Sequence, residues 1–217
     1  MTDAPAGGGA LDAARPVLQA VRVSTARVSE MDNACYLLTC TATGAQLLVD
    51  AADDAPRLLD LAGGRLDAVV TTHGHRDHHR ALPEVVRATG AQVLVGEPDA
   101  GDLPVPPDRV LRHGDVVEVG DLRLDVVGLR GHTPGSVALV LHDPSGRVLV
   151  LTGDSLFPGG VGATGGDAAR FARLLDDVVE RLFSVLPDRA EVLPGHGEPT
   201  TLGAERPHLA AWRERGW

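Results

Sequence analysis

The sequence predicts a single-domain α/β fold with four layers, in which two β-sheets pack face to face and helices cover both outer faces. Short runs rich in valine and leucine, separated by turns, occur in both halves of the chain. Segments with helical spacing of apolar residues follow these runs in each half. Because sheets and amphipathic helices must both bury an apolar face, this order favours an αββα sandwich.

Length and composition limit the alternatives. The chain has 217 residues, 43% of them hydrophobic, which is enough for one sizeable core. We expect residues 1–15 to form a flexible tail and residues 16–217 to form the domain. The N-terminus lacks the apolar segment of a secretory signal, and no apolar run approaches the ~20 residues of a membrane helix. A cytoplasmic location without membrane contact is therefore expected, and the net charge of −10 argues against nucleic acid as a partner.

The first half predicts a meander followed by βαβ units. Strands are expected at 21–24, 34–40 and 46–51. A helix over 55–63 ends at a glycine pair, and a buried strand over 66–73 leads directly into a polar cluster. A helix over 78–90 and a strand over 92–96 follow.

The second half predicts a similar order. Four strands lie between residues 115 and 153, and a glycine-rich loop at 158–166 precedes an amphipathic helix over 167–186. A strand over 190–196 and a helix over 205–216 follow, with Trp212 and Trp217 expected to pack that last helix. Two cysteines without a CxxC pattern, Cys35 and Cys40, are expected to be buried and structural.

The strongest chemical signal is the segment HGHRDH at the end of the strand expected at 66–73. His73 and His75 are two residues apart in an extended segment, so both side chains can face one metal ion. Asp77 and His78 fall at the turn into the next helix, where they can face a second ion. Imidazole nitrogen and carboxylate oxygen are normal zinc donors that also suit iron or manganese. A cluster of this density indicates a metal site, whereas a lone histidine is usually structural.

Three further polar residues follow expected strands. His132 lies in GLRGHTPGS, Asp154 in LVLTGDSLF and His196 in EVLPGHG. Each alone is compatible with an ordinary turn residue or helix cap. Together at strand ends, where loops bring functional groups into proximity, they indicate further metal ligands.

The motifs HGHRDH, GHTPGS, TGDSLF and LPGHG, in that order, resemble the metal motifs of the metallo-β-lactamase superfamily. The resemblance extends from about residue 20 to the C-terminus and implies the family's αββα fold. The aspartate of TGD is similar to that of glyoxalase II-like hydrolases. The family pattern implies one metal held by His73, His75 and His132 and a second by Asp77, His78 and His196, with Asp154 bridging and Asp50 behind the site as a hydrogen-bond partner.

The resemblance implies a hydrolase acting on a small-molecule substrate. Two divalent ions, with zinc expected and iron or manganese as alternatives, would supply a bridging hydroxide. Asp77 would orient this nucleophile or carry its proton. The expected substrate is a small acyl thioester, or a related ester or lactone. Glyoxalase II proper has a further C-terminal helical domain that binds glutathione; we expect none here, so the thiol and the oligomeric state are not predicted.

Other interpretations remain open. Persulfide dioxygenases share this fold but use one iron held by two histidines and an aspartate, a role that His73, His132 and Asp154 could fill. A metal-stabilised binding module without activity and a phosphoesterase or nuclease are further alternatives. His79 is expected to support the site rather than ligate, and three histidines outside the motifs are expected to face solvent: His113, His142 and His208.

Overall fold

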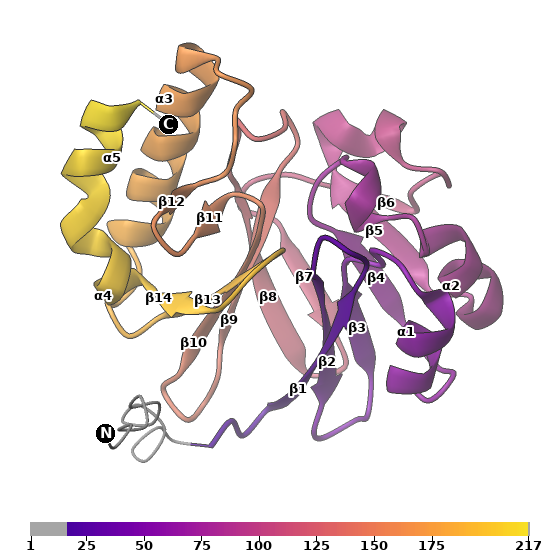
Figure 1. The fold of residues 1–217 in the computed structure, drawn as a ribbon. Coiled ribbons are helices and arrows are strands. Elements are labelled where there is room, and N and C mark those ends of the chain that lie inside the picture. Colours follow the sequence, from indigo (N-terminus) through magenta and orange to yellow (C-terminus); the bar gives the residue numbers. More distant parts are fainter. Residues whose placement is uncertain (1–16, 217) are drawn as a thin grey trace, which may run out of the picture.

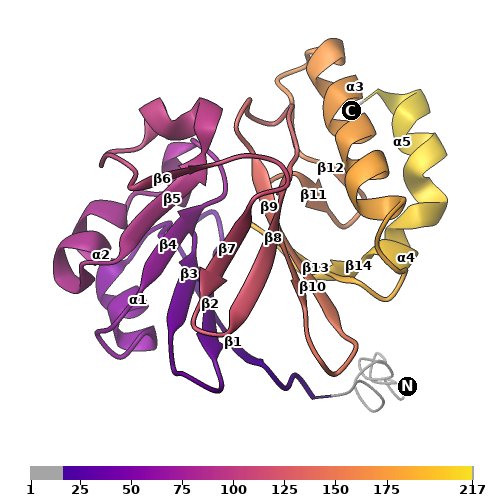
Figure 2. The same cartoon turned by 180° about the vertical axis from the view of Figure 1, so that it is seen from behind.

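The computed structural model describes residues 17–216, so the tail expected at 1–15 and Trp217 lie outside the described residues. Two six-stranded sheets form the centre of the molecule, and helices cover their outer faces (Figures 1 and 2). The four-layer αββα architecture predicted from the sequence is confirmed.

The first sheet has the strand order β1-β2-β3-β4-β5-β6. Strands β1 to β3 form the antiparallel meander expected from the sequence, and β3 to β6 run parallel. Helices connect the parallel strands, which gives the expected βαβ character. The elements are β1 (Val21–Val28), β2 (Asn33–Cys40), β3 (Gln46–Val49), α1 (Ala55–Leu61), β4 (Ala68–Thr71), the 3-10 turn η1 (Arg76–His78), α2 (Leu82–Thr89), β5 (Gln92–Gly96), the 3-10 segment η2 (Glu97–Asp102) and β6 (Arg109–Leu111).

The second sheet has the order β14-β13-β10-β9-β8-β7. Only the β10–β13 pair is parallel. The elements are β7 (Val116–Val119), β8 (Leu122–Gly128), β9 (Val137–His142), β10 (Val148–Gly153), the hairpin β11 (Leu156–Phe157) and β12 (Gly160–Val161), α3 (Ala168–Val178), the π-helical turn η3 (Val179–Phe183), β13 (Glu191–Pro194), β14 (Thr200–Thr201), α4 (Leu202–Glu205), the 3-10 turn η4 (Arg206–His208) and α5 (Leu209–Arg215).

Three layers of apolar contact hold the sandwich together. The central core lies between the sheets, where Leu38 and Leu47 of one sheet face the apolar residues of the other, such as Leu139. Helices α1 and α2 pack on the outside of the first sheet, and α3 and α5 on the outside of the second, the latter through Trp212. Each fully buried leucine contributes roughly 2 kcal/mol, so these layers fix the positions of the loops at the strand ends.

Helix boundaries differ from the prediction where proline or local geometry intervenes. The helix expected over 78–90 begins at Leu82, with Pro83 in its first turn. The helix expected over 167–186 ends its regular α-helical part at Val178 and continues as a π-helical turn. Pro207 lacks a backbone N–H, and the last helix is divided around it into α4, η4 and α5.

Several expectations for individual side chains are confirmed. Cys35 and Cys40 are buried and free, and Trp212 packs in the core beneath the last helix. The three histidines outside the motifs, His113, His142 and His208, are exposed. No helix within residues 17–216 is both long enough and apolar enough to cross a membrane.

A buried carboxylate, Asp143, anchors the start of the first sheet to the β9–β10 turn. Its oxygens accept hydrogen bonds from the backbone N–H groups of Gln19, Ala20 and Ser145 at 2.8–3.1 Å. Burial alone would raise the pKa of Asp143, but the hydrogen bonds from Ser145, Gln19 and Ala20 outweigh it and lower the pKa to about 2. The ionised form is therefore the stabilising one.

We predict that Asp143→Asn lowers the free energy of unfolding by about 2 kcal/mol at neutral pH, because each unit of pKa difference between the folded and unfolded chain corresponds to about 1.4 kcal/mol. The folded pKa lies below the unfolded one, so this contribution is complete above about pH 4 and disappears as the pH falls toward about 2. Urea unfolding of both proteins across this range measures it. A difference that did not change with pH would contradict the assignment.

Candidate metal centre

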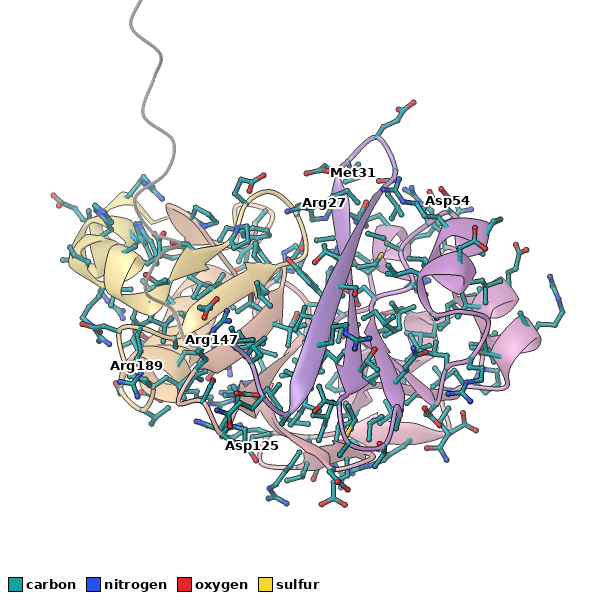
Figure 3. All side chains as sticks on the ribbon, turned by 90° about the horizontal axis from the view of Figure 1, so that it is seen from below. Arg27, Met31, Asp54, Asp125, Arg147 and Arg189 are labelled. Atoms are coloured by element: carbon teal, nitrogen blue, oxygen red, sulfur yellow. The ribbon has the colours of Figure 1, made fainter. Side chains whose placement is uncertain are left out.

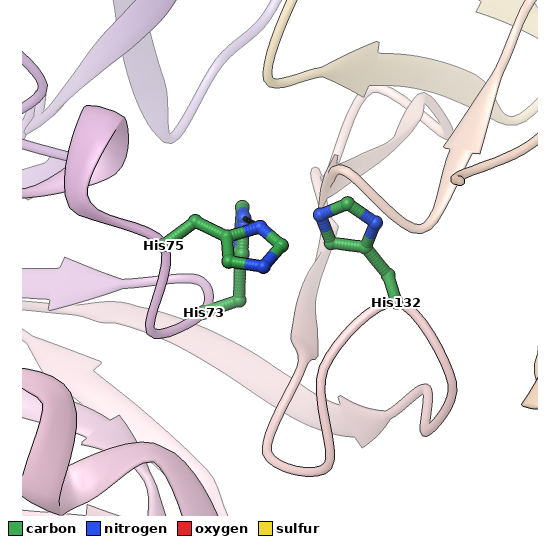
Figure 4. Close-up of side chains that lie close together, drawn as sticks. All are labelled: His73, His75 and His132. Carbon is green, nitrogen blue, oxygen red and sulfur yellow. Dashed lines mark hydrogen bonds between the residues drawn. The ribbon is translucent and has the colours of Figure 1, made fainter. Parts of the chain in front are cut away.

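The seven sequence-predicted ligands lie together at one end of the sandwich. Each donor segment follows a strand: His73 and His75 come after β4, Asp154 directly after β10 and His196 after β13, while His132 lies in the loop between β8 and β9. Figure 4 shows that His73 and His75 from the first sheet face His132 from the second. The site therefore forms only when both sheets are packed together.

Three groups of donor atoms within this cluster lie close enough to hold a metal ion. Within each group, the donor atoms lie within 4.8 Å of one another. His73 belongs to the first and second groups and His78 to the second and third, so the cluster is continuous. The groups are His73, His75 and His132; His73, His78 and Asp154; and Asp77, His78 and His196.

The Asp154 carboxylate lies in the middle of the cluster. One oxygen is 3.4 Å from His78 Nε2, and the other is 3.7 Å from His132 Nε2 and 3.5 Å from His196 Nε2. A single carboxylate thus faces imidazoles of both expected ligand sets. The sequence motif implies a bridging role for Asp154, and this position would allow it to contact ions in both sets.

Hydrogen bonds on the outer side of the rings orient three of the imidazoles. The Nδ1 atom of His78 lies 2.8 Å from Asp50 Oδ2, that of His132 lies 2.7 Å from the Ala163 carbonyl oxygen, and that of His196 lies 2.8 Å from the Met31 carbonyl oxygen. Met31 is on the turn that joins β1 to β2 (Figure 3). Because Nδ1–H donates outward, Nε2 presents its lone pair to the cluster, which is the tautomer a metal requires.

Asp50 stands behind the cluster, as expected from the sequence. It is buried, with a left-handed backbone conformation (φ 61°) that only a few non-glycine residues adopt. Besides His78, its carboxylate accepts hydrogen bonds from the backbone N–H and the hydroxyl of Thr72 at 2.7 and 2.9 Å. Since Thr72 precedes His73, Asp50 holds two donor residues at once.

The cluster fits a divalent metal ion. Two buried atoms that face it, His132 Nε2 and Asp154 Oδ1, have no hydrogen-bond partner within residues 17–216. Buried polar atoms are normally paired, so this pattern indicates a partner other than protein. A Cβ at Gly195 would lie 2.4 Å from Asp154 Oδ1, and the glycine of the LPGHG motif therefore leaves room for that carboxylate.

The electrostatics of the donors agree with metal binding. Burial and the neighbouring imidazoles lower the pKa of His73 well below its usual value, and burial lowers the pKa of His132. Burial would also lower the pKa of His78, but Asp50 and Asp154 outweigh it and raise the pKa to about 10. His73 and His132 are thus neutral donors at neutral pH, and an ion at His78 would displace a proton.

Asn33, which no sequence motif indicated, is fully buried at the start of β2. Its amide nitrogen donates to Asp77 Oδ2 at 3.2 Å and lies 3.2 Å from His196 Nε2. The only signal was a polar residue beside the apolar run ACYLLTC. His79, expected to have a supporting role, is buried, and its Nε2 atom lies 3.2 Å from the Gly74 carbonyl oxygen.

Comparison with known proteins identifies the family. A model described as the metallo-beta-lactamase superfamily matches residues 30–196, which include all seven candidate ligands. The chain belongs to this superfamily. The resemblance stated from the motifs is therefore confirmed.

Curated relatives and solved structures are similar to different shares of this chain. A hydroxyacylglutathione hydrolase of Fuscovulum blasticum is 45% identical over 133 residues, 60% of this chain and 51% of its own. The chain thus spans about half the length of that relative. ETHE1 from Myxococcus xanthus superposes with a TM-score of 0.76 at 29% identity, covering 89% of this chain and 85% of its own. TTHA1623, solved in a di-iron-bound form, superposes with a TM-score of 0.69 at 32% identity, covering 85% and 97%.

We predict that Asp50→Asn weakens zinc binding by about 10–100-fold, a typical cost of losing a group that orients a metal ligand. The amide would place an N–H₂ group against either the Thr72 donors or the His78 ring, so one of these contacts is lost. Competition with a chromophoric chelator measures the affinity. Asp53→Asn, a change at a half-exposed carboxylate paired with Arg80, is the matched control. Equal zinc affinity in the two variants would contradict the role of Asp50.

Proposed function

We propose that the chain is a dinuclear metal-dependent hydrolase that cleaves a small acyl thioester, or a related ester or lactone. The observation that carries this proposal is the convergence of two donor sets on one carboxylate, Asp154. In this proposal His73, His75 and His132 hold one divalent ion, Asp77, His78 and His196 hold the other, and Asp154 bridges them.

The names of the relatives support both parts of the proposal. Relatives named hydroxyacylglutathione hydrolase favour a hydroxyacyl thioester as the substrate class. The di-iron form of TTHA1623 favours a centre with two ions. The donor set of imidazoles and carboxylates suits zinc, with iron or manganese as alternatives. A small-molecule substrate and a cytoplasmic location belong to the same proposal.

Two bound divalent ions would lower the pKa of a water molecule and polarise the substrate carbonyl. The chain's own residues supply positioning and proton transfer. Asp77 Oδ2 lies 3.3 Å from His196 Nε2 and accepts a hydrogen bond from the Asn33 amide. Burial alone would raise the pKa of Asp77, but His78 and Asn33 outweigh it and lower the pKa. Asp77 is therefore ionised at neutral pH, and its carboxylate can accept the proton of the attacking water.

The persulfide dioxygenase alternative needs a single iron held by His73, His132 and Asp154. Asp77 Oδ2 lies 3.4 Å and His196 Nε2 lies 3.1 Å from His78 Nε2. A single ion at the first three residues would leave this second group of donors unused. This second donor set favours the hydrolase. Oxygen uptake with a persulfide substrate, in the absence of thioester hydrolysis, would reverse this preference.

We predict that Asp77→Ala lowers kcat/KM for hydroxyacyl thioesters by about 10²–10⁴-fold, the usual contribution of a positioned general base. The overall fold should persist, because Asp77 lies in a short 3-10 turn outside the apolar cores. Steady-state kinetics and circular dichroism measure the two effects.

Asp188→Ala is the matched control for this experiment. Asp188 is a mostly exposed carboxylate that pairs with Arg206 and precedes β13, whereas His196 follows that strand. Exposed ion pairs contribute little to stability, so this variant should keep wild-type activity. Undiminished hydrolysis by Asp77→Ala would contradict the proposed role of Asp77.

A further inference from the structure

Asp99, a carboxylate outside all the metal motifs, lies directly behind two of the donor loops. It belongs to η2, the 3-10 segment that follows β5, and its exposed fraction is 0%. Burying a carboxylate is unfavourable unless hydrogen bonds satisfy it, so its partners indicate what it does.

The Asp99 carboxylate joins the loop of HGHRDH to the loop of GHTPGS. Oδ2 accepts hydrogen bonds from the Gly74 backbone N–H at 2.8 Å and from the Thr133 hydroxyl at 2.5 Å. Oδ1 accepts one from the Gly135 backbone N–H at 2.7 Å. Gly74 lies between His73 and His75, and Thr133 directly follows His132. The Asp99 side chain thus contacts a residue that is adjacent in sequence to each of the three histidines of the first donor set.

The glycines at these contacts are matched to Asp99. A Cβ at Gly135 would lie 2.6 Å from the Asp99 carboxylate carbon. A Cβ at Gly74 would lie 3.2 Å from the Asp99 Cβ and 2.7 Å from Asp102 Oδ2. Both loops approach η2 too closely for any larger residue, so their separation is set by the carboxylate between them.

His75 makes this contact important for the metal centre. His78, His132 and His196 each have an outward hydrogen bond from Nδ1, and His73 contacts the Thr72 hydroxyl. Within residues 17–216, the His75 ring has a hydrogen bond only with the His73 ring. This exposed ring packs edge-on against the rings of His73 and His132, so its place in the cluster depends on the position of its backbone, which Asp99 holds at Gly74.

We infer that Asp99 is a positioning residue that sets the spacing between His73, His75 and His132, so that the three imidazoles converge on one ion. The inference rests on the proposed metal-dependent function. Asp99 does not touch the cluster itself and acts through the two loops. The second donor set, Asp77, His78 and His196, has no contact with Asp99 among the described hydrogen bonds.

Asp99→Asn tests the inference with almost no change of volume. An amide keeps one acceptor oxygen and places an N–H₂ group against the remaining donors, so at least one of the three contacts is lost. Chelator-driven release of zinc from the metal-loaded full chain is the readout. We expect one ion to be released with an affinity about 10–100-fold weaker than in the wild type, and the other with unchanged affinity. For hydroxyacyl thioesters, kcat should fall more than KM changes.

Two controls separate positioning from general destabilisation. Asp143→Asn replaces another buried carboxylate that accepts backbone N–H bonds. Asp143 lies in the β9–β10 turn, at the other end of β10 from Asp154, so this variant should release both ions as the wild type does. Thr133→Val removes one of the three Asp99 contacts, together with the contact between this hydroxyl and Ser136 Oγ, and keeps the side-chain shape, whereas Thr133→Ser keeps the hydroxyl. We expect weaker binding of one ion in the valine variant and recovery to within about threefold of the wild type in the serine variant. If Asp99→Asn does not fold, the valine and serine variants of Thr133 test the inference in its place.

Wild-type affinity for both ions in Asp99→Asn, or in Thr133→Val where that variant replaces it, would overturn the inference. An equal loss in Asp143→Asn would overturn it as well. A wild-type chain that held only one ion would instead contradict the dinuclear function. In that case, weaker binding of the single ion by Asp99→Asn would support the role of Asp99, and unchanged affinity would contradict it.

Discussion

The packing of seven donor side chains into one cluster is the constraint on which the rest of the site depends. Imidazoles and carboxylates from both sheets lie with neighbouring donor atoms 3.4 to 3.7 Å apart at Asp154. His73, His78 and His132 are buried, and Asp77, Asp154 and His196 are partly buried. Among residues 17–216, buried atoms of this cluster such as His132 Nε2 and Asp154 Oδ1 have no hydrogen-bond partner. A metal ion compensates because it accepts several lone pairs at once. The relative position of the two sheets at this end of the sandwich must therefore be tightly restricted.

Residues behind the donors restrict that freedom. Asp50 holds His78 and the residue before His73, while backbone carbonyl groups of Met31 and Ala163 fix the rings of His196 and His132. Asp99 adds the connection between the two loops of the first donor set. Nearly all of these partners are provided by loops or turns, and the apolar cores beneath hold those loops in place.

Much of the architecture and the candidate ligands could be predicted, because they depend on local patterns. His73 and His75 follow a buried apolar strand, Asp154 follows another, and the structure has all three at these strand ends. Asn33 and Asp99 could not be predicted in the same way. Asp99 is 25 residues from Gly74 and 36 from Gly135, so only the packed fold reveals its contacts. Short edge strands such as β6 and β14 lack a periodic signal, since two or three residues cannot show alternation.

The most direct test of the central claim is the metal content of the full chain, purified without chelators or a histidine tag and measured by elemental analysis. Two donor sets that share a bridging carboxylate predict two equivalents of metal per chain, as zinc or as a mixed pair. A single equivalent of iron would contradict this account and support oxygen-dependent chemistry at His73, His132 and Asp154.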